Sequence, residues 1–144
     1  MVNDMKIWIN KCSAEEKSAD FSEAITFNLS VPGQAGIIVS SIRDSWYRSL
    51  GVQKVTPVLE DLYVISLCVF AADKRIPRNR TPDGWTRGMH LNIPVLEEEK
   101  WNSVKKDLEK ALSYLSGDIW ELTFRHSLEA NRYEDKHKRQ PIRN

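Results

Sequence analysis

The fold of this chain is decided by residues 87–126, RGMHLNIPVLEEEKWNSVKKDLEKALSYLSGDIWELTFRH. Near each end of this stretch, apolar residues occupy every second position: Met89, Leu91, Ile93 and Val95, then Trp120, Leu122 and Phe124. A period of two is typical of a β-strand. The middle instead has apolar residues at three- and four-residue steps: Trp101, Val104, Leu108, Leu112 and Leu115. The passage therefore predicts strand, helix and strand, with a connection long enough for a right-handed parallel crossover.

The ends of the helix in this passage are marked by its own residues. Glutamates fill its first turn, where the helix dipole favours anions, and Gly117 follows its last turn. We expect the helix over about Glu97–Leu115, with its apolar stripe buried against a sheet. Pro94 lacks an N–H for the sheet ladder, so the strand before the helix should end at a sheet edge or just before a turn.

Two further helices are predicted upstream of this passage. Val39, Ile42, Trp46 and Leu50 recur at helical steps, and Gly51 then stops the helix. The second helix is TPVLEDLYVISLCVFAAD at residues 56–73, with Thr56 as N-cap and a proline at its first helical position. The β-branched and aromatic residues of that second segment leave a buried strand as the alternative.

The amino-terminal part predicts two strands, MKIWIN at residues 5–10 and AITFNLSV at residues 24–31, which should pair. The polar residues between them are typical of a long hairpin loop. The expected fold is an α+β domain over residues 1–127, with a four-stranded mixed sheet, about three helices and the order β-β-α-α-β-α-β. Residues 128–144 lose periodicity and gain charge, which predicts a charged tail or linker.

Size and composition are those of one globular domain. The 144 residues suffice for a core without disulfides or metals, and the composition is 41% hydrophobic and 28% charged. The longest apolar run, 62–72, is too short to cross a bilayer, and the start has no signal-peptide pattern, so we expect a cytoplasmic protein without membrane contact. Two cysteines, Cys12 and Cys68, form no framework, and Cys68 is interpreted as a small buried hydrophobe.

No catalytic or metal-binding motif is present, so neither a catalytic residue nor a cofactor is predicted. Glycine-rich phosphate loops, nucleophile elbows and HExxH are all absent from the sequence. His90 and His126 fall on the third and fourth predicted strands and would be neighbours if these strands pair. A metal site would need further ligands, which the sequence does not place beside them, so hydrogen-bonded or surface histidines are the preferred interpretation.

The strongest candidate for a binding surface is ADKRIPRNRTPDGWTRG at residues 72–88, which carries five cations against two carboxylates, a net charge of +3. Two prolines and a PDG turn signal predict a stiff loop. We assign contact with a partner or an anion to four arginines, listed here: Arg75, Arg78, Arg80 and Arg87. Asp73, Asp83 and Trp85 are assigned to shaping the loop, with the carboxylates pairing with arginines and the ring tucked beneath it.

A second basic segment lies at the carboxyl end. Residues 125–144 hold six cations against three carboxylates, also a net +3, while the whole chain is at +1. Loop and tail together would suit a nucleic-acid backbone, the alternative function, although Tyr133 is the one aromatic residue in the tail for base stacking.

The order of several segments resembles the N-terminal domain of QueC-like proteins from bacterial anti-phage islands, namely QatC-type and type IV CBASS-associated proteins. The segments are GIIVSSIRDSWYRSLG, DLYVISLCVFAADKRIPR, DGWTRGMHLNIPV and LSGDIWELTFR, and the resemblance covers about residues 37–127. It rests most on the following residues: Ala72, Asp73, Arg75, Arg78, Trp85, Arg87, Pro94, Trp101, Gly117, Asp118, Trp120 and Arg125.

This resemblance implies a role in antiviral defence beside an ATP-pyrophosphatase domain like that of 7-cyano-7-deazaguanine synthase. Such a domain begins with an SGGLDS-like loop, which this sequence does not contain. We therefore expect a non-catalytic accessory domain that presents the Arg-rich loop to a partner, either a QueC-like catalytic domain or another protein of the defence operon. Either the natural chain continues past Asn144 into that domain, or the domain is a separate chain.

Overall fold

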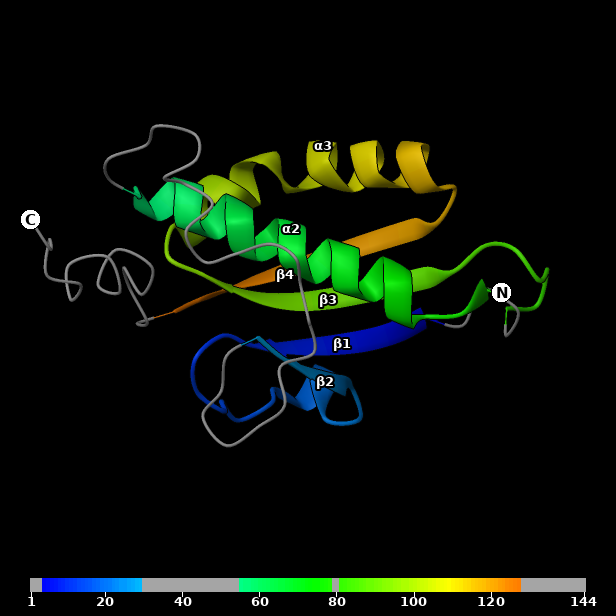
Figure 1. Ribbon diagram of the computed structural model, residues 1–144, viewed down its shortest axis with the longest axis horizontal. Helices are drawn as coiled ribbons and strands as arrows, with labels where there is room; N and C mark the ends of the chain where they lie inside the picture. The colour runs from blue at the N-terminus through cyan, green and yellow to red at the C-terminus, as the bar shows by residue number, and fades with distance from the viewer. Residues whose placement is uncertain (1–3, 30–54, 79–80, 128–144) are drawn as a thin grey trace, which may run out of the picture.

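The computed structural model describes residues 4–29, 55–78 and 81–127 (Figure 1). Its elements in chain order are β1 (Asp4–Asn10), the 3-10 helix η1 (Ala19–Phe21), β2 (Ile25–Asn28), α2 (Pro57–Arg75), β3 (Gly88–Val95), α3 (Glu98–Ser116) and β4 (Ile119–His126). The α+β class is confirmed. The helix predicted around Val39–Leu50 and the tail at 128–144 lie outside the described residues.

The four strands form one sheet in the order β2-β1-β3-β4, and every neighbouring pair is parallel. The predicted mixed sheet and hairpin are therefore wrong. The 14-residue connection between β1 and β2 is long enough for a crossover and lacks a tight hairpin turn. Its Phe21 is buried against Trp8 of β1, with ring centroids 6.0 Å apart, so this connection folds back over the sheet.

The connections divide between the two faces of the sheet. The chain moves from β1 to β2 toward one edge, and then through β3 and β4 toward the other. Right-handed crossovers place connections that run in opposite directions on opposite faces. In agreement with this rule, α2 and α3 lie together on one face (Figure 1), while Phe21 packs on the residues of the other.

The core lies between the sheet and the two helices. The strands alternate, so that Ile7, Ile9, Leu91, Ile93 and Leu122 all face the helices and have no exposed surface. Val64, Cys68 and Ala72 of α2 pack against them and are also fully buried. Thr56 Oγ1 accepts a hydrogen bond from the Leu59 N–H at 3.2 Å, which confirms the predicted N-cap and the helical interpretation of this segment.

Of the two positions expected for Pro94, the one just before a turn is correct, because β3 ends at Val95, and the sheet edge is wrong, because β3 is an inner strand. Pro94 is paired with Arg125 of β4, but it lies beyond Trp8↔Asn92, the last pair between β1 and β3. Pro94 has no N–H to donate toward β1. Arg125 Nη2 instead donates to the Ile9 carbonyl, so a guanidinium supplies a link that the ladder lacks there.

The apolar stripe of α3 is less buried than predicted. Trp101, Leu108 and Leu112 are partly buried against the core, whereas Val104 is 43% exposed and Leu115 is 80% exposed. The reason is the placement of the two helices, because α2 packs on β3 and α3 packs on β4. An open apolar groove remains between them, lined by side chains of both helices.

Candidate functional site

Asp118 is the centre of the most connected polar cluster among the described residues. It follows Gly117, whose positive φ of 76° makes the tight turn from α3 into β4. The Asp118 side chain has no exposed surface. Its Oδ1 accepts from Arg78 Nη1 at 2.7 Å and its Oδ2 from Arg78 Nη2 at 3.0 Å, which is the bidentate geometry. We call Asp73, Arg78, Arg87 and Asp118 the Asp118 node.

Arg87 is the second cation of the Asp118 node and is almost fully buried. Its Nη2 donates to Asp118 Oδ2 and to Asp73 Oδ1, both at 2.7 Å, and its backbone N–H donates to Asp118 Oδ1 at 3.0 Å. Its Nη1 donates to the carbonyls of Asp73 and Ile76, whereas its buried Nε has no partner. The node therefore joins the end of α2 to the starts of β3 and β4.

Ion pairing shifts the pKa values of Asp118 and Arg87. Burial works to raise the pKa of Asp118, but the hydrogen bonds and charge of Arg87, with help from Arg78, outweigh burial and lower it. Burial likewise works to lower the pKa of Arg87, and its bonds to Asp118 and Asp73 raise it instead. Asp118 and Arg87 are consequently both ionised at neutral pH.

The tip of the loop is held by Asp83. Its Oδ1 accepts from the N–H groups of Trp85 and Thr86 at 2.9 and 2.8 Å, and Thr81 Oγ1 lies 3.0 Å away. These bonds, the Trp85 N–H first, lower the pKa of Asp83. Gly84 takes a φ of 69°, which the turn requires. Asp83 thus holds the turn through backbone N–H groups and Thr81, where the sequence had suggested pairing with an arginine.

Trp85 has the opposite placement from the one predicted, because its side chain is 67% exposed and is not tucked under the loop. Its backbone is fixed on both sides: the N–H bonds to Asp83, and the carbonyl accepts from Arg78 Nη1 at 3.0 Å. The Arg78 guanidinium carbon lies 5.9 Å from the centroid of the ring. A large aromatic side chain is thus displayed outward from a fixed backbone.

The four arginines predicted for contact are not equivalent. Arg78 and Arg87 point into the Asp118 node, and Arg75 is exposed in the last turn of α2. Arg80 lies outside the described residues. Whether these arginines bind a partner stays a prediction. The sequence assigned no site role to Asp118, although its position directly after a helix-ending glycine was the available signal for a buried tie.

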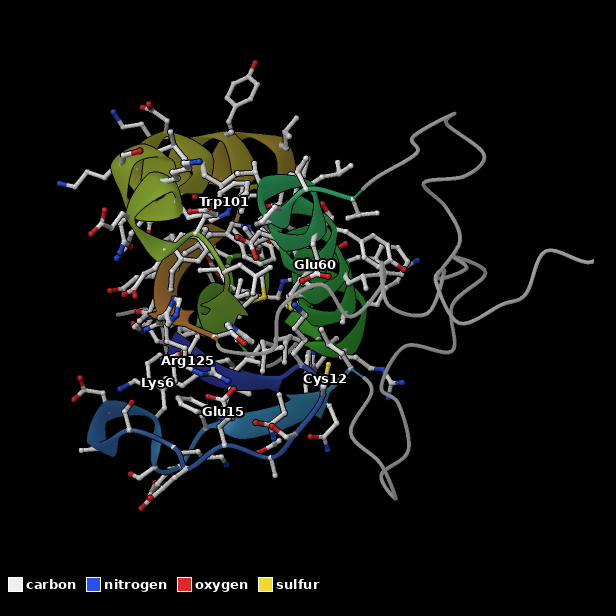
Figure 2. All side chains as sticks on the ribbon, turned by 90° about the vertical axis from the view of Figure 1, so that its left-hand side faces the viewer. Lys6, Cys12, Glu15, Glu60, Trp101 and Arg125 are labelled. Atoms are coloured by element: carbon white, nitrogen blue, oxygen red, sulfur yellow. The ribbon has the colours of Figure 1, made fainter. Side chains whose placement is uncertain are left out.

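Figure 2 looks along the strands onto their carboxyl ends, where open parallel sheets commonly bind ligands. Lys11 Nζ lies 2.7 Å from Glu60 Oε2, and both side chains are buried. Asp61 accepts from the Leu96 and Glu97 N–H groups and from Trp101 Nε1 at 2.7 to 3.0 Å. Asp61 thus occupies the amides beside the start of α3 that an anionic ligand would otherwise use.

The face of the sheet opposite the helices is also closed by internal contacts. The Arg125 guanidinium stacks 3.9 Å from the centroid of the Trp8 ring and pairs with Glu15 at 3.2 Å (Figure 2). It also donates to Asn92 Oδ1 at 2.8 Å. These contacts tie the connection after β1 to the sheet and give Arg125 a structural role.

The two histidines that the structure describes do not lie beside each other. His90 pairs with Glu121 and His126 with Val95, so the two histidines lie at opposite ends of β3 and β4. Within residues 4–29, 55–78 and 81–127, no group of three or more His, Cys, Asp or Glu is arranged to hold a metal ion. Cys68 is buried as predicted, and burial raises the pKa of its thiol far above the usual range.

The fold and the Asp118 node together define an α+β domain whose parallel sheet is covered on one face by α2 and α3, with the Asp118 node at the amino-terminal ends of β3 and β4. Comparisons with family models, curated proteins and solved structures find no match for the chain. Neither described helix is long and apolar enough to span a membrane.

Proposed function

We propose that this chain is a non-catalytic interaction domain whose contact surface is the loop over residues 72–88, and that its partner is a QueC-like catalytic domain. The observation that carries the proposal is the display of Trp85. Its ring is 67% exposed while its backbone is held by Asp83 and Arg78. Exposed tryptophans on fixed backbone are favoured as energetic centres of protein interfaces, because little conformational entropy is lost on binding.

The choice of partner rests on the resemblance to QueC-like defence proteins. The residues that carry this resemblance include Asp73, Arg78, Arg87 and Asp118, which are the four members of the Asp118 node. Their role in this proposal is to keep the loop in one shape. The contact itself is assigned to Trp85, with Arg75 and Arg80 as the flanking cations.

The test is a calorimetric titration of the purified chain with a separately purified QueC-like ATP-pyrophosphatase domain. We expect a 1:1 complex that the Trp85→Ala variant weakens by at least about tenfold, the range of an interface centre. Tyr114→Ala is the matched control, because Tyr114 is an aromatic residue of α3 that is 89% exposed and lies outside the loop. It should leave the affinity unchanged.

The nucleic-acid alternative is separated by salt. Binding to phosphates weakens by orders of magnitude between about 50 and 200 mM salt, whereas a protein interface centred on an aromatic side chain weakens far less. Arg78 and Arg87, two of the four loop arginines, are already paired with the buried Asp118 carboxylate. Fewer cations of the loop are therefore left to bind phosphates. A steep salt dependence together with capture of a fluorescent oligonucleotide would reject the proposal in favour of the alternative.

A further inference from the structure

An open apolar groove lies between α2 and α3, above the core side chains Ile65 and Trp120. It has a volume of about 590 Å³. Its walls are formed by apolar side chains of both helices, chiefly Leu62, Val69 and Phe70 of α2 and Leu108, Leu112 and Leu115 of α3. Trp120 of β4 also lines the groove, with its indole N–H donated to Ser116 Oγ at 2.8 Å.

Several of these walls are exposed to an extent unusual for side chains of their type. Leu62 is 47% exposed, Phe70 is 48% exposed and Leu115 is 80% exposed. Contiguous apolar surface of this kind marks sites of interaction with another molecule. The lining positions recur along each helix at steps of three and four residues, as 62, 65, 66, 69 and 70, and as 108, 112 and 115. That is the spacing of a surface that receives another helix.

One end of the groove carries charged side chains of both signs, and Lys74 lies beside its Phe70 wall. Arg78 and Asp73 line that end, and the Lys74 ammonium lies 5.7 Å from the centroid of the Phe70 ring. The two carboxylates nearby, Asp73 and Asp118, are already bound by Arg87 and Arg78. Both Nη atoms of Arg78 are used in its own contacts, so Lys74 is the cation best placed to meet a ligand carboxylate.

The length of the groove fits a short helix. The lining residues run from 62 to 73 on α2 and from 108 to 116 on α3, which is roughly 12 to 17 Å at the rise of an α-helix. We infer that this groove binds a partner segment of about three helical turns, with apolar residues at helical spacing and an acidic residue at the end that meets Lys74. The inference rests on the proposed function, because it names a second contact of the same interaction domain.

The experiment needs no known partner. Random 16-residue peptides displayed on their messenger RNA are selected on the immobilised chain, and enriched peptides are titrated by fluorescence polarisation. We expect enriched sequences with apolar residues at i, i+3 or i+4 and i+7, and with Asp or Glu at one end. Their affinity should fall at least about tenfold on Leu115→Glu and stay within about twofold on Tyr114→Glu. These adjacent residues of α3 are both mostly exposed, so both variants should fold.

A charge swap tests the orientation. Lys74→Glu should weaken the selected peptide, and replacing the acidic peptide residue by lysine should restore the binding to that variant. Enrichment of sequences without helical spacing, no enrichment at all, or equal binding to wild type and Leu115→Glu would overturn the inference. The peptide selection uses no QueC-like domain, so its failure would overturn the groove inference alone. Failure of the titration with the QueC-like domain would overturn the proposed function alone.

Discussion

At the scale of single residues, arginine and tryptophan in the 72–88 loop have the reverse of their usual roles. Arginines are typical contact residues, yet Arg78 and Arg87 stabilise the loop from inside, because a carboxylate lies buried within reach of both. A tryptophan is typical of a core, yet Trp85 is displayed outward. The buried Asp118 decides the placement of the two arginines, whereas Asp83 and Arg78 hold the backbone of Trp85.

The Asp118 node should contribute stability that depends on pH. We expect Asp118→Asn to lower the free energy of unfolding by about 3 kcal/mol at pH 7, because Arg87 is left buried without its main counter-charge. The pKa of Asp118 is lower in the folded chain than in the unfolded one, so this contribution is complete well above pH 4 and is lost as the pH falls through the folded value. Urea melts at pH 7 and about pH 3 measure it.

The control for this prediction is Asp107→Asn, because Asp107 is an exposed carboxylate of α3. This substitution should change the free energy of unfolding little at either pH. If the free energies of unfolding of wild type and Asp118→Asn differ by as much at pH 3 as at pH 7, the charge of the carboxylate is not the source of the stability.

Trp85→Ala should have little effect on folding. A side chain that is 67% exposed makes few contacts to lose, so we expect the free energy of unfolding to change by less than about 0.5 kcal/mol. Trp120→Ala is the comparison, because that ring is 4% exposed and its loss should cost about 3 to 5 kcal/mol. Equal losses for the two variants in denaturant melts would place Trp85 in the core.

At the scale of elements, the two helices differ in how much each depends on the sheet. α2 contributes fully buried side chains such as Val64 and Cys68, whereas no residue of α3 is fully buried. The periodicity of α3 predicted its existence and nearly its bounds. The degree of burial could not be predicted in the same way, because it depends on the distance at which α2 packs beside it.

The difference should appear in the cost of truncating leucines. Leu122→Ala in β4 removes a side chain with no exposed surface, and we expect a loss of about 3 to 5 kcal/mol in the free energy of unfolding. Leu108→Ala, in the half-open groove, should cost only about 1 to 2 kcal/mol, because less apolar surface returns to water. A Leu108 variant as damaging as the Leu122 variant in urea melts would mean that α3 is buried as deeply as the sheet.

At the scale of the whole molecule, the strand order puts early and late parts of the chain side by side. β1 lies between β2 and β3, and β3 between β1 and β4, so the inner strands are paired on both sides. Hydrogen exchange should consequently be slowest in the amides of β1 and β3, and faster in the four-residue edge strand β2. Exchange followed by NMR measures this order directly. Protection in β2 equal to that in β3 would contradict it.

Local pattern determined most of the elements of this protein. The alternation in β1, β3 and β4, the capped start of α2 and the glycine after α3 are each set by residues within a few positions of one another, so the sequence alone predicts them. The tertiary structure alone decided the parallel direction of β2, the inner position of Pro94 and the inward turn of Arg78 and Arg87. The physical reason is distance along the chain, since Arg78 and Asp118 are 40 residues apart. Contacts between such distant residues form only after the strands have paired in their final order.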